Sequence, residues 1–330
     1  MGKTTLLDIA KAVEVSKTTV SMVLNRKPIN VSEETKKRIF EAAEELNYIP
    51  NSLARSLTTN KSNTIGFIIP DIQNPFFAEM TKAIEIAAEN NGYNMILCNT
   101  FNSGKKEEEH IKLLISKLID GVIIVPSGEK NQGIEILKGN NVPFVIADRM
   151  ISDHEGINGV FSDNESGIKV GVEYLLEKGH KSIAFISGKQ EGIVNTRLHY
   201  FKKIVAQYGI FKEELIESAD FSIEGGISAT EKLMDKGRTI DSIFYSSDVM
   251  AIGGMKYLLR KGYRIPEDIS ILGYDNIAMS SFIEPELTTV AQPIYKMGEE
   301  SFNLLMKLLK SKTSEGKVKL MPYLVERKTV

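Results

Sequence analysis

Acidic, basic, amide and aromatic side chains recur beyond residue 63 wherever an apolar run of the sequence ends. They are Asp71, Asn74, Phe76, Phe77, Asp148, Arg149, Asp248, Asp275 and Gln292. A sugar hydroxyl both donates and accepts hydrogen bonds, which suits carboxylate, amide and guanidinium groups, while the apolar face of a sugar ring packs on aromatic rings. Each residue alone is explained as well by a loop cap or a turn. Their joint recurrence predicts a site for a small sugar.

The segments that would position these side chains alternate between apolar strands and amphipathic helices. One series runs from Thr64 through TIGFIIP, NMILCN, GVIIVP and PFVIAD, and a second begins after about Asp163 with IAFISG, SIFYSS, ISILGYD and TTVAQP. This alternation predicts an α/β body of two lobes, each a doubly wound parallel sheet. We expect lobe one at 63–162 and 293–325, with the strand KLMPYLVER returning to it, and lobe two at 163–291. Ligands of such sheets bind beyond the carboxyl ends of the strands, which would face the cleft.

The first 50 residues carry the signals of three short helices. Thr5 with Asp8 fits a capping box, and Ser16 and Ser32 suit the N-caps of the second and third helices. The three inward-facing stripes would be Leu6, Ile9, Ala10 and Val13, then Val20, Val23 and Leu24, then Ile39, Phe40, Ala43 and Leu46. Two helices across a tight turn, followed by a third, predict an α-helical helix-turn-helix domain over residues 1–50.

The second of these helices would present a polar face. Opposite its apolar stripe lie Thr18, Ser21, Met22 and Asn25, with Lys17 at the margin. In a helix-turn-helix DNA reader, side chains at this place reach base edges in the major groove. The first 62 residues carry a net charge of +3, against −5 for the remainder, which favours a polyanionic partner. A small helical domain with a solvated polar face is the alternative.

After Pro50 the segment NSLARSLTTNKSN has little apolar core, which predicts a linker over 51–62 between this domain and a binding body at 63–330. In one interpretation, Leu53 and Leu57 only anchor this linker on the body.

The composition excludes several other classes of protein. No apolar run approaches the roughly 18 to 20 residues of a membrane-spanning helix, and a cytoplasmic protein is expected. Cys98 is the only cysteine, which excludes an intrachain disulfide and a thiolate metal cluster, and the four histidines show no metal spacing. The motifs GxGxxG, GxSxG and HExxH are missing, so we predict no enzyme, no metal and no cofactor. A transport binding protein, which would share the body, would need an export signal and no helix-turn-helix domain.

The order and spacing of TLLDIAKAVEVSKTTVSMVLN and VSEETKKRIFEAAEELNYIPNSLARSL resemble the N-terminal module of the LacI family of bacterial transcription regulators. The resemblance implies that operator bases are contacted by Lys17, Thr18, Ser21 and Met22, and that phosphate-contacting or structural positions are Thr5, Leu6, Ser16, Thr19, Asn25 and Tyr48. It also implies that the linker is a hinge, helical when two copies pack on DNA, with Leu57 wedged into the minor groove beside Ala54 and Arg55.

Two positions of the N-terminal module depart from the family pattern. Family members usually have Gly in the turn where this chain has Glu14, and a guanine-reading Arg where it has Met22. Because Met cannot make the bidentate contact of Arg to guanine, the operator core should differ from the commonest family sequence.

The body resembles the periplasmic sugar-binding protein fold of the same family, especially its ribose-type members. The resemblance implies that Phe77 and Phe221 sandwich a sugar ring and that its hydroxyls are held by Asp148, Arg149, Arg197, Asp275 and Gln292. We expect Asn74, Phe76 and Ser247 in the same site. Ser247 stands where the ribose-type pattern has Asn, which favours a monosaccharide or a close relative over ribose itself. The alternative is a catabolite-control-type regulator that responds to a phosphorylated carrier protein or a phosphorylated sugar; Asp148 and Arg149 argue against it.

These features predict a sequence-specific DNA-binding transcriptional regulator, a repressor, whose operator affinity is controlled by a small sugar or sugar-like effector. Its partners would be double-stranded palindromic operator DNA, the effector and a second copy of the chain, with no membrane. A homodimer is expected because one helix-turn-helix domain buries too little surface for tight specific binding, while two copies read a palindrome.

Overall fold

The computed structural model describes residues 4–49, 61–127, 132–149, 157–189, 195–311 and 316–330. The chain divides into two compact units, Met1–Ser62, here called the head, and Asn63–Val330, here called the body. Each unit is described on its own.

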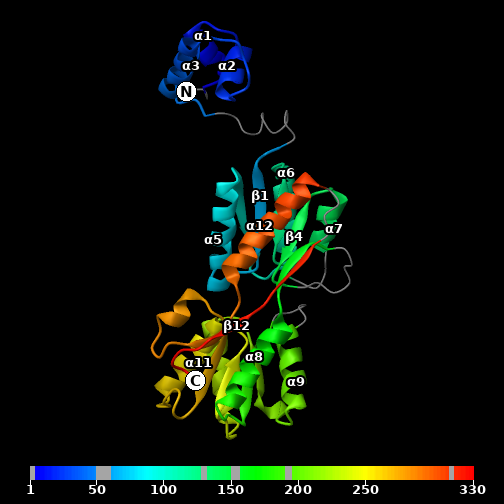
Figure 1. Ribbon diagram of the computed structural model, residues 1–330, viewed down its shortest axis with the longest axis vertical. Helices are drawn as coiled ribbons and strands as arrows, with labels where there is room; N and C mark the ends of the chain where they lie inside the picture. Colours follow the sequence, from blue (N-terminus) through cyan, green and yellow to red (C-terminus); the bar gives the residue numbers. More distant parts are fainter. Residues whose placement is uncertain (1–3, 50–60, 128–131, 150–156, 190–194, 312–315) are drawn as a thin grey trace. The chain divides into compact units, whose positions relative to one another are not determined.

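The head contains three helices, α1 (Leu6–Val13), α2 (Lys17–Leu24) and α3 (Glu33–Glu45), drawn in blue in Figure 1. Local hydrogen bonds begin each of them. The Thr5 backbone N–H donates to Asp8 Oδ2 at 2.8 Å, and the Ser16 and Ser32 hydroxyls accept from backbone N–H groups three residues on. These are the caps that the sequence predicts, because such side chains satisfy donors that a helix start leaves open.

The head encloses a small core in which Ile9, Val13, Val20, Val23 and Ile39 are buried. The prediction that Phe40 and Leu46 also face inward is wrong, since their exposed fractions are 45% and 37%. The alanines Ala42 and Ala43 of α3 pack on the core beside Ile39, so Phe40, one residue past Ile39, is turned away from it.

The first lobe of the body is built on a six-stranded sheet in which all neighbouring strands are parallel, in the order β11-β5-β4-β3-β1-β2. Helices α5 and α12 pack on one of its faces and α6 and α7 on the other (Figure 1). The elements are β1 (Thr64–Ile69), α5 (Pro75–Asn90), β2 (Asn94–Asn99), α6 (Gly104–Ser116), β3 (Gly121–Ile124), α7 (Gln132–Gly139), β4 (Phe144–Ala147), β5 (Gly159–Ser162), α12 (Ile294–Lys310) and β11 (Lys317–Leu320).

The second lobe repeats this plan with the strand order β12-β10-β9-β8-β6-β7. Its strands are parallel except for β12, which runs antiparallel to β10. Helices α8 and α9 cover one face of the sheet, and α10 and α11 cover the other. The elements are α8 (Asn164–Glu177), β6 (Ile183–Gly188), α9 (Thr196–Gln207), η1 (Glu213–Leu215), β7 (Ile216–Ala219), α10 (Ile223–Asp235), β8 (Ser242–Tyr245), α11 (Asp248–Arg260), β9 (Ser270–Asp275), η2 (Ala278–Ser281), β10 (Thr288–Ala291) and β12 (Tyr323–Val325).

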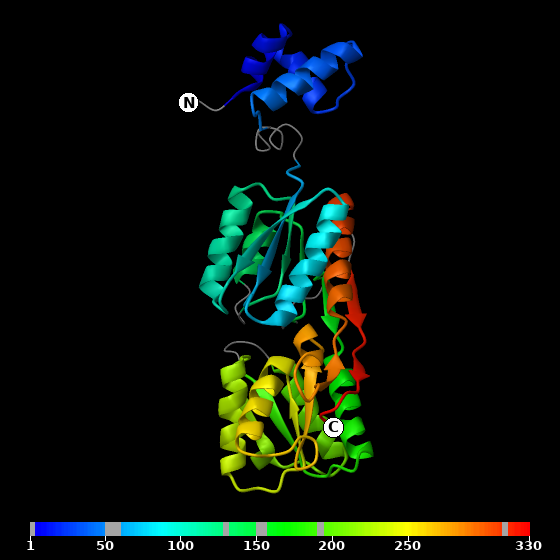
Figure 2. The same ribbon diagram turned by 90° about the vertical axis from the view of Figure 1, so that its left-hand side faces the viewer.

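Within the described residues the chain passes between the lobes three times: from β5 to α8, from β10 to α12 and from β11 to β12 (Figures 1 and 2). The assignment of all of 293–325 to lobe one is therefore wrong at its end, because Tyr323–Val325 belongs to the second sheet. Pro322 lies between β11 and β12 and has no N–H to continue the β11 ladder, so the chain leaves the first sheet there.

The predicted fold class, a helix-turn-helix head with a two-lobed α/β body, is confirmed. None of the helices in the described part of the chain is long and apolar enough to cross a membrane.

Candidate functional site

The first candidate surface is the polar face of α2 in the head. Lys17, Thr18 and Asn25 are exposed, and Ser21 and Met22 are half-buried. The Asn25 amide donates to the Ser21 carbonyl at 2.7 Å and so closes the end of the helix. This face of α2 thus presents polar groups and one thioether. Side chains of this size can enter a DNA major groove.

The remaining head positions named from the sequence support this helix. Thr5 and Ser16 are the N-caps of α1 and α2, and the Thr19 backbone N–H donates to the Ser16 hydroxyl at 3.0 Å. Leu6 and Tyr48 pack against the head core. The hinge positions Ala54, Arg55 and Leu57 lie outside the described residues.

Glu14, in the turn between α1 and α2, has φ 58° and ψ 44°. This is the left-handed region, which glycine adopts without steric cost and other residues adopt rarely. The backbone therefore keeps the turn geometry for which the family pattern uses Gly, with a Glu in its place.

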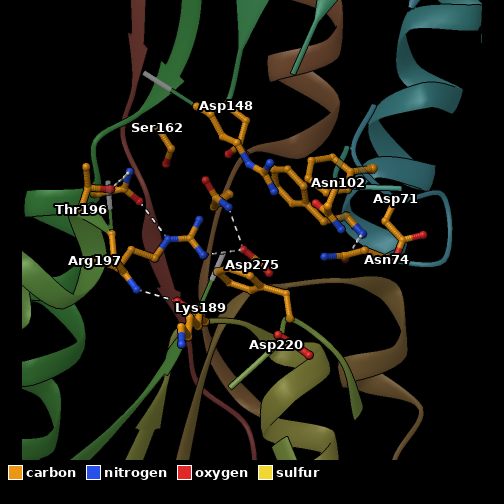
Figure 3. A pocket seen from close by; sticks show the side chains of 18 of the residues that line it. Asp71, Asn74, Asn102, Asp148, Ser162, Lys189, Thr196, Arg197, Asp220 and Asp275 are labelled. Carbon is orange, nitrogen blue, oxygen red and sulfur yellow. Dashed lines mark hydrogen bonds and ion pairs between the residues drawn. The ribbon is translucent and has the colours of Figure 1, made fainter. Parts of the chain in front are cut away.

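The second candidate site is a cavity of about 660 Å³ between the two lobes of the body (Figure 3). Predicted residues that line it are Asn74, Phe76, Phe77, Asp148, Arg149, Arg197, Phe221, Asp275 and Gln292. Figure 3 shows Asp148 and Asn74 on first-lobe elements and Arg197 and Asp275 on second-lobe elements, with their side chains converging on one space. The carboxyl ends of the strands of both sheets meet here, as in other open parallel sheets.

Ser247 does not line the cavity, so its assignment to the site is corrected. It is the N-cap of α11, its hydroxyl accepts from the Met250 backbone N–H at 3.4 Å, and 1% of its surface is exposed. Asp248, which follows it, is fully buried and also lies away from the lining. Ser247 and Asp248, which the sequence predicted to lie at a ligand site, instead form the start of α11.

Arg197 and Asp275 belong to a hydrogen-bonded polar group in the cavity. The Arg197 guanidinium donates to Asn164 Oδ1 at 2.9 Å, to the Ser246 carbonyl at 2.5 Å and to Asp275 Oδ1 at 3.3 Å. Gln292 donates its amide to the same Asp275 oxygen at 2.7 Å. The guanidinium also lies 4.0 Å from the centre of the Tyr274 ring, a cation–π distance. These contacts fix both charged groups before any ligand arrives.

Asp148 and Arg149 face this group from the first lobe. Arg149 donates to the Pro126 carbonyl at 2.9 Å, and its Nε lies 4.0 Å from Asp148 Oδ2. The Arg149 guanidinium is 5.6 Å from the centre of the Phe77 ring. Asp148 has φ 64° and Asp275 has φ 122°, both unusual for residues other than glycine. Such backbone conformations cluster at ligand sites, where surrounding contacts impose them.

Burial shifts the acid–base behaviour of these groups. It raises the pKa of Asp275 to about 8, against the opposing effect of Arg197, and it raises the pKa of Asp148 as well. Burial likewise lowers the pKa of Arg149 to about 10. Burial has therefore removed water from these ionisable groups. A ligand that forms hydrogen bonds to them could take the place of that water.

The structure adds lining residues that sequence reasoning missed. They are Asn102, Ser162, Asn164, Gly188, Lys189, Asn195, Thr196, Asp220 and Ser222, whereas Asp71, which also lines the cavity, was named from the sequence. Several lie just beyond the end of a strand: Lys189 and Asp220 directly follow β6 and β7, and Asn102 lies three residues after β2. The rule used for the other strands would have found these three. A Cβ at Gly188 would lie 2.0 Å from the Phe221 ring, so only glycine lets that ring lie here.

The arrangement suits hydrogen bonding and ring stacking rather than bond breaking. Among the described residues, no group of three or more His, Cys, Asp or Glu could hold a metal ion. The Gln292 Oε1 atom is buried without a hydrogen-bond partner although its residue lines the cavity. A buried acceptor left open in this way is expected where a ligand supplies the donor.

Similarity to known proteins agrees with this architecture. Residues 5–51 match the model of bacterial regulatory proteins of the lacI family, and residues 62–328 match that of periplasmic binding proteins and the sugar binding domain of the LacI family. The chain is 42% identical to the ribose operon repressor of Halalkalibacterium halodurans, over 94% of this chain and 91% of that protein.

Two solved structures extend the comparison. A lac repressor dimer bound to operator and the anti-inducer ONPF has 29% identity and a TM-score of 0.89 over 99% of each chain. A LacI family regulator from Enterococcus faecium with bound ribose has 32% identity and a TM-score of 0.73, over 81% of this chain and 98% of that one. The protein is thus a DNA-binding transcriptional regulator and not an enzyme, as the sequence predicts. The chain belongs to the LacI family of bacterial regulatory proteins.

Proposed function

We propose that the protein is a homodimeric repressor that binds a palindromic operator through two heads and a neutral monosaccharide in the cavity of each body. Binding of the sugar changes the affinity for the operator. Because its target is chromosomal DNA, the protein acts in the cytoplasm.

The proposed operator contacts follow from the exposed face of α2. Lys17, Thr18, Ser21 and Met22 would meet base edges, while Thr5, Leu6, Ser16, Thr19, Asn25 and Tyr48 would contact phosphates or support the helix. The lac repressor relative is described as a dimer bound to operator, which supports the same arrangement for this chain. Ala54, Arg55 and Leu57 remain the proposed minor-groove contacts of the hinge over 51–62.

The observation that carries the effector proposal is the unused hydrogen-bonding capacity of the cavity. Gln292 Oε1 is buried without a hydrogen-bond partner among the described residues, and the Asp148 carboxylate lies 4.0 Å from Arg149 Nε, too far for a hydrogen bond. Hydrogen bonds hold Arg197 and Asp275 in place beside Gln292, and Asp148 faces them from the first lobe. A ligand with several hydroxyls would satisfy all of them at once, since each hydroxyl both donates and accepts.

The charge of the lining favours a neutral sugar over a phosphorylated one. The acidic residues Asp71, Asp148, Asp220 and Asp275 face the basic residues Arg149, Lys189 and Arg197. A phosphate group prefers an excess of positive charge and free backbone N–H groups, and each lining carboxyl that is ionised would repel it. The relatives named for the ribose operon and for bound ribose support a pentose or a sugar of similar size.

Isothermal titration calorimetry with D-ribose, other neutral pentoses and hexoses, and D-ribose 5-phosphate tests the proposal. We expect a neutral monosaccharide to bind and the phosphate ester to bind more weakly. Fluorescence anisotropy with an operator selected from a randomised library then measures whether that sugar changes operator affinity. The proposal fails if no neutral sugar binds, or if operator binding responds only to a phosphorylated carrier protein, as a catabolite-control regulator would.

A further inference from the structure

Asp248, the first residue of α11, is a buried carboxylate that the cavity does not use. Its exposed fraction is 0%. Oδ1 accepts a hydrogen bond from the Thr289 hydroxyl at 2.6 Å, and Oδ2 accepts from the Ser280 hydroxyl at 2.7 Å and from the Ile277 backbone N–H at 3.0 Å. Three donors on one buried carboxylate make a strong local anchor, because bonds to a charged acceptor are shorter and stronger than neutral ones.

Two of these donors belong to the loop that follows Asp275 in the cavity. Asp275 and Asn276 have φ values of 122° and 59°, and the next residues are Ile277 and the short helix η2, which contains Ser280. Non-glycine residues persist in such conformations only where the surroundings impose them. A Cβ at Gly273 would lie 2.2 Å from Asp248 Oδ1, so the glycine lets the carboxylate approach the end of β9 closely.

The same loop contacts the first lobe. The Ala278 backbone N–H donates to Glu79 Oε1 on α5 at 2.8 Å, across the two lobes. Ile277 is buried in the first-lobe core cluster with Phe76 and Phe77, which begin α5 and line the cavity. One loop therefore joins Asp275, the Asp248 anchor and the helix that carries the aromatic side of the cavity.

We propose that Asp248 is a positioning residue for effector binding: without touching the effector, it holds the 276–281 loop so that Asp275 faces the cavity and Ala278 meets Glu79. This proposal rests on the proposed function of the cavity as the effector site. Its rival is a purely structural role, in which the carboxylate stabilises the second lobe and has no separate effect on the ligand.

A pair of matched variants separates these roles. Ser280→Ala removes a bond on the loop side of the carboxylate, and Thr289→Val removes the bond on its β10 side while keeping the shape of the side chain. Both delete one hydroxyl donor to the same carboxylate, so both should lower thermal stability. Positioning predicts that Ser280→Ala raises the Kd for D-ribose about tenfold, whereas Thr289→Val changes it less than about twofold.

Asp248→Asn and Asp248→Ala extend the test. An asparagine carbonyl can accept from Ile277 and Ser280 while its amide donates to the Thr289 hydroxyl. We therefore expect Asp248→Asn to retain ribose affinity within a few-fold and Asp248→Ala to lose it. Equal losses in Ser280→Ala and Thr289→Val, or unchanged affinity in Ser280→Ala and Asp248→Ala, would overturn the positioning role.

Hydrogen exchange of the ligand-free, full-length protein keeps this test independent of the effector. Positioning predicts faster exchange of the Ile277 and Ala278 amides in Ser280→Ala than in Thr289→Val, because only the first variant loosens the loop. Equal exchange in the two variants refutes it. If the wild-type protein binds no neutral sugar, the proposed effector class fails, while the exchange experiment still decides whether Asp248 holds the loop.

Discussion

The two candidate sites of this protein are built in opposite ways. The proposed DNA-binding surface of the head lies on one helix of eight residues, α2, whose polar side chains reach solvent or are half-buried. The cavity of the body collects side chains between residues 71 and 292, and its Arg197 and Asp275 are held by a hydrogen-bond network. One site is a local surface, and the other is an assembly of buried charges.

This difference determines what a substitution can change. An exposed side chain of α2 can be replaced without leaving a buried group unpaired, so its replacement alters recognition more than stability. In the cavity, removal of one partner leaves the others desolvated and unsatisfied, which costs affinity and disturbs neighbouring pKa values. The two regions should therefore respond differently to substitutions of similar size.

The largest effect is expected for Asp275→Ala. Removing the carboxylate deletes charge-assisted bonds to a sugar and frees Arg197 and Gln292, so effector affinity should fall by about 2–4 kcal/mol. Calorimetry at pH 8.5, above the pKa of about 8 so that most of the carboxyl is ionised, measures this loss. Operator affinity should stay near that of the wild type.

Asp268→Ala is the matched control for this variant. Asp268 is a surface carboxylate paired with Arg264 at 2.5 Å, and it lies outside the cavity lining. We expect it to leave sugar binding unchanged. Unchanged sugar binding in Asp275→Ala itself would remove Asp275 from the effector site and undo the contrast with the head.

Met22→Arg tests whether a substitution on α2 changes the recognition of operator bases. Arg can make the bidentate contact to guanine that Met cannot, so operator preference should shift toward guanine at one base pair per half-site by about 1–3 kcal/mol. Selection from a randomised palindromic library at one salt concentration measures the shift. Glu41→Gln adds the same charge on α3 and should leave base preference unchanged. Identical half-sites for Met22→Arg and the wild type would show that Met22 does not face the bases.

The contrast between the sites also explains what the sequence could predict. The starts of α1, α2 and α3 depend on Thr5, Ser16 and Ser32, each of which acts on residues three positions away, so local signals sufficed. Phe40 was misplaced because its burial depends on how α3 packs on α1 and α2, which a single helix does not reveal.

The cavity was predicted from a rule about parallel sheets rather than from local pattern. Asp148 and Asp275 could be found because both follow an apolar strand. Ser247 follows a strand too, yet it caps α11, and the sequence cannot distinguish a capping side chain from one that turns to a ligand. Tyr323–Val325 was misplaced because its pairing with β10 joins residues more than 30 positions apart.

The pH dependence of the body would sharpen the comparison with the head, where hydrogen bonds from Thr5 lower the pKa of Asp8. Burial raises the pKa of Asp275 to about 8. If the sugar binds the ionised carboxylate, affinity should increase by up to about tenfold per pH unit below pH 8 and level off above it. Calorimetry between pH 6 and 9 measures this profile, and Asp275→Asn should flatten it.

The raised pKa of Asp275 also makes the stability of the folded protein depend on pH. The folded-state pKa lies above the ordinary value of 3.8, so the folded protein holds this proton after the unfolded chain has released it. The contribution to the free energy of unfolding is therefore present below about pH 4 and is lost as pH rises to about 8. Thermal melts of the wild type and Asp275→Asn across this pH range measure the contribution of Asp275 to the free energy of unfolding. A difference between the two that stays constant with pH would contradict the raised pKa.

The smallest effect is expected at Glu14, where the head departs from the family pattern. Its left-handed backbone disfavours any side chain with a Cβ, so Glu14→Gly should stabilise the head by about 0.5–1 kcal/mol, after the greater chain entropy of glycine is subtracted. Hydrogen exchange of the α1 and α2 amides in the full-length protein measures the gain. Glu14→Ala removes the same carboxylate but keeps the Cβ, so it should give no such gain, and effector affinity should be unchanged in both variants. Equal stabilisation by Ala and Gly would mean that the carboxylate, rather than the backbone, destabilises the turn.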